Sequence, residues 1–157
     1  MRTFSCVCGQ TLFFENVACE RCKREVGWCP SCHAIAALES LGDGNYRCAN
    51  ADCGATVVKC TNYAFEHVCN RCLPVPPANG GLCDACRFNR TIPDLSVPGN
   101  RERWAELEAA KRRLFYTLDL LKLLYGTPQD GFSPPLAFDF KADTIPSDGL
   151  WRWMGAG

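Results

Sequence analysis

Apolar residues recur at helical spacing in one stretch of this 157-residue chain, close to its C-terminal end. Between Arg101 and about Tyr125 they fall at Trp104, Leu107, Leu114, Phe115, Leu118, Leu121 and Leu124. This spacing places them on one broad stripe of a helix, so we predict an amphipathic helix over residues 101–126, with Asn100 as its N-cap. Such a helix is about 37 Å long, more than small neighbouring units can cover, so we expect it to self-associate or to pack on a further surface. We expect Arg112 and Arg113 on its solvent face.

The remaining apolar segments are short and interrupted. Residues 11–14 and 34–38 are typical of short strands, and Asp43-Gly44 is typical of a hairpin turn. Residues 136–140 alternate like a single strand, which we expect to lack a neighbour. Prolines at 93 and 98 favour an extended connector over residues 91–100. We expect residues 143–157 to be poorly ordered.

The first 86 residues contain only 14 Val, Ile, Leu or Met, but they contain all 13 cysteines. Ordering the backbone costs about 1–2 kcal/mol of conformational entropy per residue, and the burial of so few apolar side chains does not offset this cost. Metal ions or disulfides must therefore supply the remaining stability. The cysteines form close pairs, namely Cys6-x-Cys8, Cys19-x2-Cys22, Cys29-x2-Cys32, Cys69-x2-Cys72 and Cys83-x2-Cys86. Two such pairs complete a tetrahedral shell of four thiolates. An odd cysteine count without an apolar leader favours structural zinc over disulfides or iron.

The pairs divide this half of the chain into three units. Residues 1–27 form a first zinc ribbon with Cys6, Cys8, Cys19 and Cys22, and residues 28–58 form a second with Cys29, Cys32, Cys48 and Cys53. Residues 59–90 form a third cluster with Cys60, Cys69, Cys72, Cys83 and Cys86. Five thiols compete there for four positions. Spacing favours leaving Cys60 spare, and the alternative uses Cys60 with Cys69 and leaves Cys72 spare; His67 could also replace a thiol. We therefore expect two to three structural Zn²⁺ ions.

Charge adds little to this picture. The chain has 17 Lys+Arg and 17 Asp+Glu, so no net positive field attracts nucleic acid or a membrane, and no apolar run is long enough to span a bilayer. We expect a cytoplasmic protein. Each zinc with four thiolates carries about −2, which shifts the total to roughly −6 for three sites. Cations beside the cysteines should offset this charge locally: Arg21, Lys23, Arg24, Arg71 and Arg87.

Two other interpretations of the cysteine pattern have less support in the sequence. Cys29-Pro30-Ser31-Cys32-His33 matches the c-type haem attachment pattern, but no axial partner or export signal accompanies it. Redox exchange by a Cys-x2-Cys pair normally requires a thioredoxin-like βαβ unit, which the pattern does not predict. The fold class we predict is α+β: a small metal-stabilised β region of two to three zinc ribbons, then one long helix and a short strand.

Four stretches resemble bacterial zinc-binding metallopeptidases that carry an N-terminal zinc-ribbon region. They are Phe4–Asn16, Tyr46–Asn50, Cys86–Leu118 and Gly131–Asp143, and the most specific is the segment NRTIPDL with the helix after it. The resemblance implies that residues 127–157 begin a peptidase-like domain that is incomplete here. It favours Cys60, Cys69, Cys83 and Cys86 as the third ligand set. It also implies that the region from Trp104 to Phe115 packs on the missing domain.

The resemblance does not extend to catalysis in this chain. Such peptidases use H-E-x-x-H on a helix, and the only histidines here, His33 and His67, do not form that motif. We therefore expect no catalytic residues, and a partial or truncated family member whose ribbons serve as an accessory or docking module. The alternative is a free-standing zinc-ribbon adaptor that binds protein or nucleic acid, with bases stacking on Phe13, Phe14, Trp28, Tyr46 and Tyr63.

Overall fold

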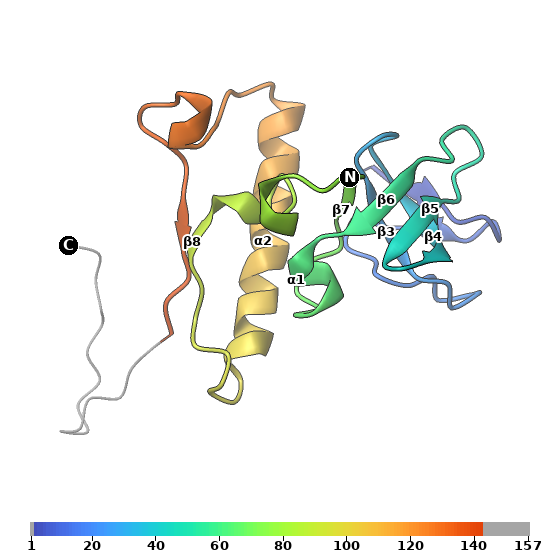
Figure 1. The fold of residues 1–157 in the computed structure, drawn as a ribbon, viewed down its shortest axis with the longest axis horizontal. Coiled ribbons are helices and arrows are strands. Elements are labelled where there is room, and N and C mark those ends of the chain that lie inside the picture. The colour runs from blue at the N-terminus through green and yellow to red at the C-terminus, as the bar shows by residue number, and fades with distance from the viewer. Residues whose placement is uncertain (1, 143–157) are drawn as a thin grey trace.

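The computed structural model describes residues 2–142 (Figure 1). Its strands are β1 Phe4–Ser5, β2 Thr11–Leu12, β3 Val26–Cys29, β4 Ala34–Gly42, β5 Asn45–Cys48, β6 Thr56–Lys59, β7 Cys72–Pro74, β8 Asn89–Thr91 and β9 Phe138–Asp139. Its helices are α1 Thr61–Ala64, α2 Asn100–Leu120 and the 3₁₀ turns Asn79–Gly81, Cys86–Phe88 and Pro128–Asp130. The fold is α+β, as the sequence predicts. The expectation for residues 143–157 lies outside the described residues.

The N-terminal unit is a two-stranded hairpin followed by a second turn. Strands β1 and β2 pair antiparallel, with Phe4 opposite Leu12. Gly9 closes the turn between them at φ 82°, a left-handed conformation that glycine adopts without a steric penalty. Phe4 and Leu12 are buried, and they share one small core with residues of β3 and β4. The hairpin therefore depends on the neighbouring sheet for its apolar contacts.

Strands β3 to β7 form a five-stranded antiparallel sheet in the order β3-β4-β5-β6-β7. The long strand β4 pairs with β3 through its first residues and with β5 through its last. Trp28 of β3 also forms a parallel bridge with Arg71, and its N–H donates to the Asn70 carbonyl at 2.7 Å. This contact brings the two edge strands together, so the second ribbon and the third cysteine cluster share one sheet.

Helix α2 lies between the five-stranded sheet and the C-terminal strands of the described chain (Figure 1). It begins after Gly99, not with Asn100 as the cap, and it ends at Leu120, six residues before the expected end at residue 126. The early end has a local cause: Lys122 has a left-handed φ of 54°, and the Leu123 N–H donates back to the Leu118 carbonyl at 3.0 Å. The helix is therefore shorter than the segment over which apolar residues recur at helical spacing.

The buried face of α2 corrects one expectation. Trp104 and Phe115 are 0% and 2% exposed, so these two side chains pack inside this chain. Arg112 is also buried, and its guanidinium donates to the Val68 carbonyl at 2.7 Å, so it does not lie on a solvent face. Arg113 is exposed and forms an ion pair with Glu15 of the first ribbon. The helix thus packs on both the first ribbon and the third cluster.

Strand β9 has a partner, contrary to expectation. It pairs in parallel with β8, and α2 lies between the two strands in sequence. The sequence pattern could not reveal this pairing because β8 has only three residues and no apolar alternation. Within residues 2–142, no helix is long and apolar enough to cross a membrane.

Candidate metal centres

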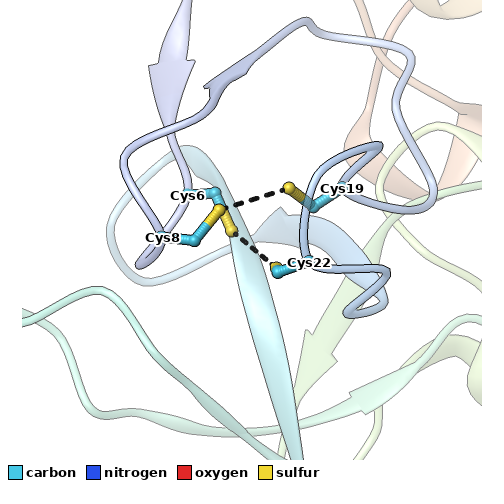
Figure 2. A group of neighbouring side chains, drawn as sticks. All are labelled: Cys6, Cys8, Cys19 and Cys22. Carbon is cyan, nitrogen blue, oxygen red and sulfur yellow. Dashed lines mark hydrogen bonds between the residues drawn. The ribbon is translucent and has the colours of Figure 1, made fainter.

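Cys6, Cys8, Cys19 and Cys22 come together between two tight turns of the first ribbon (Figure 2). The Cys6 and Cys22 sulfurs are 3.7 Å apart, and the Cys8 and Cys19 sulfurs are 3.6 Å apart. Each turn is closed by a backbone bond to its first cysteine: the Gly9 N–H donates to the Cys6 carbonyl, and the Lys23 N–H donates to the Cys19 carbonyl, both at 2.8 Å. The turns therefore present paired thiols from a rigid backbone.

Cys29, Cys32, Cys48 and Cys53 form a second group at the ends of β3 and β5. The sulfurs of Cys29 and Cys53 are 3.8 Å apart, as are those of Cys32 and Cys48. The wider spacing between Cys48 and Cys53 is accommodated by a turn in which Gly54 has a φ of 60°. The sheet brings the two halves of this site together, because β4 and β5 return the chain to the end of β3.

Cys60, Cys69, Cys83 and Cys86 form the third group, and all four are buried. The Cys69 and Cys83 sulfurs are 3.8 Å apart. Cys72 lies outside the group as a buried residue of β7, and burial raises the pKa of its thiol. The structure therefore selects the set with Cys60 as a member and Cys72 as the spare thiol, against the preference from spacing. His67 is not part of the group.

The geometry of all three groups fits a tetrahedral metal ion. A Zn–S bond of about 2.3 Å in a regular tetrahedron places sulfurs about 3.8 Å apart. The close sulfur pairs are 3.6–3.8 Å apart, and all sulfurs of each group lie within 4.8 Å of one another. None of the thirteen cysteines, all of which are described, is in a disulfide.

Hydrogen bonds and burial separate the pKa values of the thiols within each group. The backbone N–H of Cys22 lowers the pKa of Cys19 to about 6, whereas burial raises the pKa of Cys6 to about 12. In the second group, the hydrogen bond between the two thiols lowers the pKa of Cys29 to about 4 and raises that of Cys48.

Comparison with known proteins agrees with this geometry. Residues 3–97 match a family described as a zinc-ribbon domain. The chain belongs to the zinc-ribbon domain family. Its three groups of four cysteines are accordingly sites for structural Zn²⁺, two to three ions in all.

Longer relatives of this zinc-ribbon chain occur in mycobacteria. Uncharacterized proteins from Mycobacterium bovis and Mycobacterium tuberculosis are 35% identical over 132 residues. The match covers 83% of this chain and 34% of each relative, so the chain spans about a third of their length. No solved structure matches.

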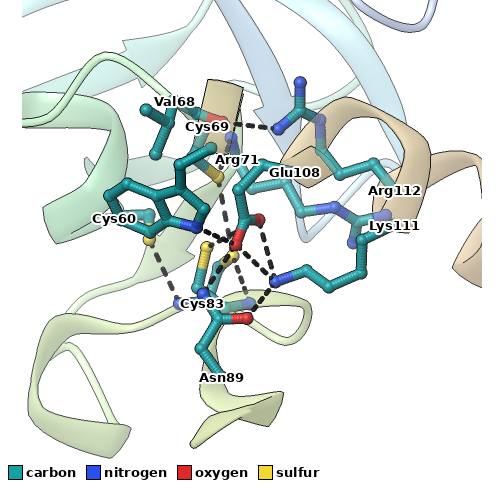
Figure 3. A network of polar contacts seen from close by, with 11 residues as sticks. Cys60, Val68, Cys69, Arg71, Cys83, Asn89, Glu108, Lys111 and Arg112 are labelled. Carbon is teal, nitrogen blue, oxygen red and sulfur yellow. Dashed lines mark hydrogen bonds and ion pairs between the residues drawn. The ribbon is translucent and has the colours of Figure 1, made fainter. Parts of the chain in front are cut away.

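The third zinc site is linked to α2 by a buried polar network (Figure 3). Glu108, with a side chain 0% exposed, lies with one carboxylate oxygen 4.0 Å from the Cys86 sulfur. It forms an ion pair with Lys111 at 2.8 Å, and it accepts hydrogen bonds from Asn89 at 2.6 Å and from the indole of Trp104 at 3.1 Å. This network fixes the helix against the segment that carries Cys83 and Cys86.

Buried cations offset the negative charge around this site. Arg112 lies close enough to help lower the pKa of Cys69, after the hydrogen bonds from the other thiols of the group. Arg71, which is 3% exposed, forms an ion pair with Asp84. The Nε atoms of both arginines lack a hydrogen-bond partner among the described residues.

The sequence predicts that Arg71 offsets the negative charge of the thiolates, but Glu108, Lys111 and Asn89 were not among the predicted site residues. One signal was available. Glu108 and Lys111 lie three residues apart on the same helical stripe as Trp104 and Phe115, which marks them as a buried pair.

The other predicted cations have local roles. Arg21 donates to the Cys8 carbonyl at 3.1 Å, and Arg87 forms an ion pair with Asp130 at 3.0 Å. Lys23 takes a left-handed conformation in the turn after Cys22, and the Arg24 carbonyl accepts from the Cys19 N–H at 2.9 Å. These contacts support the turns that carry the cysteines.

The aromatic residues considered for base stacking do not form one exposed face. Phe14 and Tyr63 are buried, at 2% and 4% exposed. Trp28 packs edge-on against Phe14, and the Lys59 ammonium lies over Tyr46. Phe13 is exposed. The structure therefore uses most of these rings in its small core.

Proposed function

We propose that this zinc-ribbon chain is a structural accessory module that docks onto the larger part of a longer polypeptide and has no catalysis of its own. The observation that carries the proposal is the third cysteine site. Its four ligands are buried, and a buried network ties them to α2, so the metal sets the position of a long helix. A helix held in this way is suited to present a fixed surface to a neighbouring domain.

The ligand sets support a structural role. Each site has four thiol ligands, which close the coordination shell, whereas a catalytic zinc keeps one position open for water or substrate. The resemblance to bacterial zinc-binding metallopeptidases fits this arrangement, with the catalytic zinc of such enzymes placed outside this chain. His33 and His67 lie in separate left-handed turns and do not form the two-histidine helix that such a centre uses.

The docking role is tested with the Mycobacterium tuberculosis relative in three forms. These are the full-length protein, a form without the region matched by this chain, and a chimaera in which this chain replaces that region. The form without the region should melt at a lower temperature, and the zinc-loaded chimaera should recover most of the difference. Equal melting temperatures for the full-length protein and the shortened form would overturn the docking role.

The absence of catalysis is tested separately on the 157-residue chain. The purified, zinc-loaded protein is incubated with a mixed peptide library, and cleavage is followed by mass spectrometry. We expect no cleavage. Hydrolysis that a chelator abolishes and zinc restores would contradict the proposal.

A further inference from the structure

The C-terminal part of the described chain is a strand–helix–strand unit. Strand β8 leads into α2, and the chain returns in β9 to pair with β8 in parallel, with the Phe140 N–H donating to the Thr91 carbonyl at 3.0 Å. Helix α2 packs on this pair through Phe115, whose ring centroid is 5.9 Å from that of Phe138. This is the arrangement of a βαβ unit, which normally belongs to a larger parallel sheet.

The sheet of this unit is incomplete within residues 2–142. There, β8 and β9 pair only with each other, over two or three residues each. A pair this small is marginally stable alone, and parallel sheets are normally covered on both faces by further elements. The parallel pair is therefore suited to extension by a further strand.

An exposed apolar stripe runs along α2 and its C-cap residue, beside the buried face of the helix. Leu107 and Leu114 of α2 and the C-cap Leu121 follow one another at seven-residue intervals and are 48%, 41% and 61% exposed. We call these three residues the leucine seam. Ala110, at the intervening position, is exposed as well, so the spacing of three and four residues matches the contact line of a second helix.

The leucine seam is continuous with a hollow next to β9. A cavity of about 110 Å³ lies at its N-terminal end, and Trp104, Leu107 and Phe140 are among the residues that line it. The exposed face of the helix and the end of the incomplete sheet thus form one surface, which a strand and a helix could cover together.

A second copy of this chain is a poor occupant for this surface. Each partner in a stable complex buries about 800 Å², and three half-exposed leucines with one alanine provide much less. A segment on the same polypeptide needs less contact area, because tethering gives it a high effective concentration. The mycobacterial relatives have such polypeptide, since this chain covers only 34% of their length.

We propose that β8–α2–β9 is the first βαβ unit of an α/β layer, completed by the part of the longer polypeptide that lies outside the matched region. A helix of that part packs on the leucine seam, and a strand extends the β8–β9 sheet. This inference rests on the docking role proposed above and adds the surface and the kind of element that it receives.

The test uses the same chimaera, with Leu107→Asp and Leu114→Asp introduced together. The matched control is Leu41→Asp, since Leu41 is 53% exposed but lies on β4, away from the seam. In the isolated chain, both variants should keep three zinc ions and the parent melting temperature, because the changed residues are exposed. In the chimaera, the seam variant should have a melting temperature close to that of the relative that lacks the matched region. The Leu41→Asp control should have the melting temperature of the unsubstituted chimaera.

Hydrogen exchange gives a second readout. Amides of residues 137–141 should exchange more slowly in the chimaera than in the isolated chain, and the seam variant should lose this protection. If the parent chimaera recovers stability and the seam variant recovers it equally, this inference fails while the docking role stands. If the parent chimaera recovers nothing, the docking role itself fails. An isolated chain that forms a dimer by light scattering, dissociated by the seam variant, would assign the surface to a second copy and overturn the inference.

Discussion

Lys111 offers the sharpest test of how the third zinc site is connected to α2. Its ammonium forms an ion pair with Glu108 at 2.8 Å, and the two side chains are 1% and 0% exposed. Replacing Lys111 with Met keeps a similar length of apolar chain but leaves the Glu108 carboxylate buried without a counter-ion. The carboxylate also lies 4.0 Å from the Cys86 sulfur, whose zinc–thiolate centre carries about −2.

The expected cost follows from this burial. Removing one partner of a buried ion pair costs about 3–5 kcal/mol, because it leaves an uncompensated charge. Asn89 and Trp104 still donate to the Glu108 carboxylate, so we expect Lys111→Met to lower the free energy of unfolding by about 3 kcal/mol, at the low end of that range. Adding Glu108→Gln removes the charge and keeps an acceptor for Trp104, so the double variant should recover most of the loss.

Urea denaturation of the zinc-saturated protein measures these differences as shifts of the midpoint at constant slope. Lys141→Met is the control, because Lys141 is exposed, and its effect should stay within about 0.5 kcal/mol. A loss below about 1 kcal/mol for Lys111→Met, or a double variant as unstable as the single one, would refute the argument that this pair is a balanced buried charge.

Three further outcomes follow from the metal sites and the packing around them. Cys60→Ser should reduce the zinc count by native mass spectrometry from three to two, whereas Cys72→Ala should leave it at three. Loss of one zinc ion with Cys72→Ala but not with Cys60→Ser would show that Cys72 is the fourth ligand of the third site. Chelation with EDTA under reducing conditions should collapse the amide dispersion of residues 1–90 in NMR spectra, and retained dispersion would show that metal is not needed for the fold. Gly27→Ala should cost about 1–3 kcal/mol, since its new methyl would lie 3.1 Å from both the Asn70 carbonyl oxygen and the Cys72 sulfur; adding Cys72→Ala should recover part of this loss, and an unchanged Gly27→Ala variant would contradict the tight packing.

The sequence by itself determined the chemistry of this protein. Close cysteine pairs beside few apolar residues indicate metal-stabilised ribbons, because a tight turn with two thiols supplies half of a tetrahedral shell whatever surrounds it. The first two ligand sets could be assigned in this way, since each consists of cysteines that neighbour one another along the chain. The long helix was equally visible, because its apolar residues repeat at the period of a helix.

The tertiary structure alone decided which thiol is spare and what the helix touches. Cys60 and Cys72 carry the same thiol, so residue type alone does not distinguish them as ligands. Only the pairing of β6 with β7 places Cys72 within the sheet, outside the third site. The burial of Arg112 was equally hidden, because charged residues on a helix are normally solvated. Its contact with the carbonyl of the distant Val68 buries it here. The local sequence pattern determines which secondary structure a segment can form, and long-range contacts determine which of its side chains are buried.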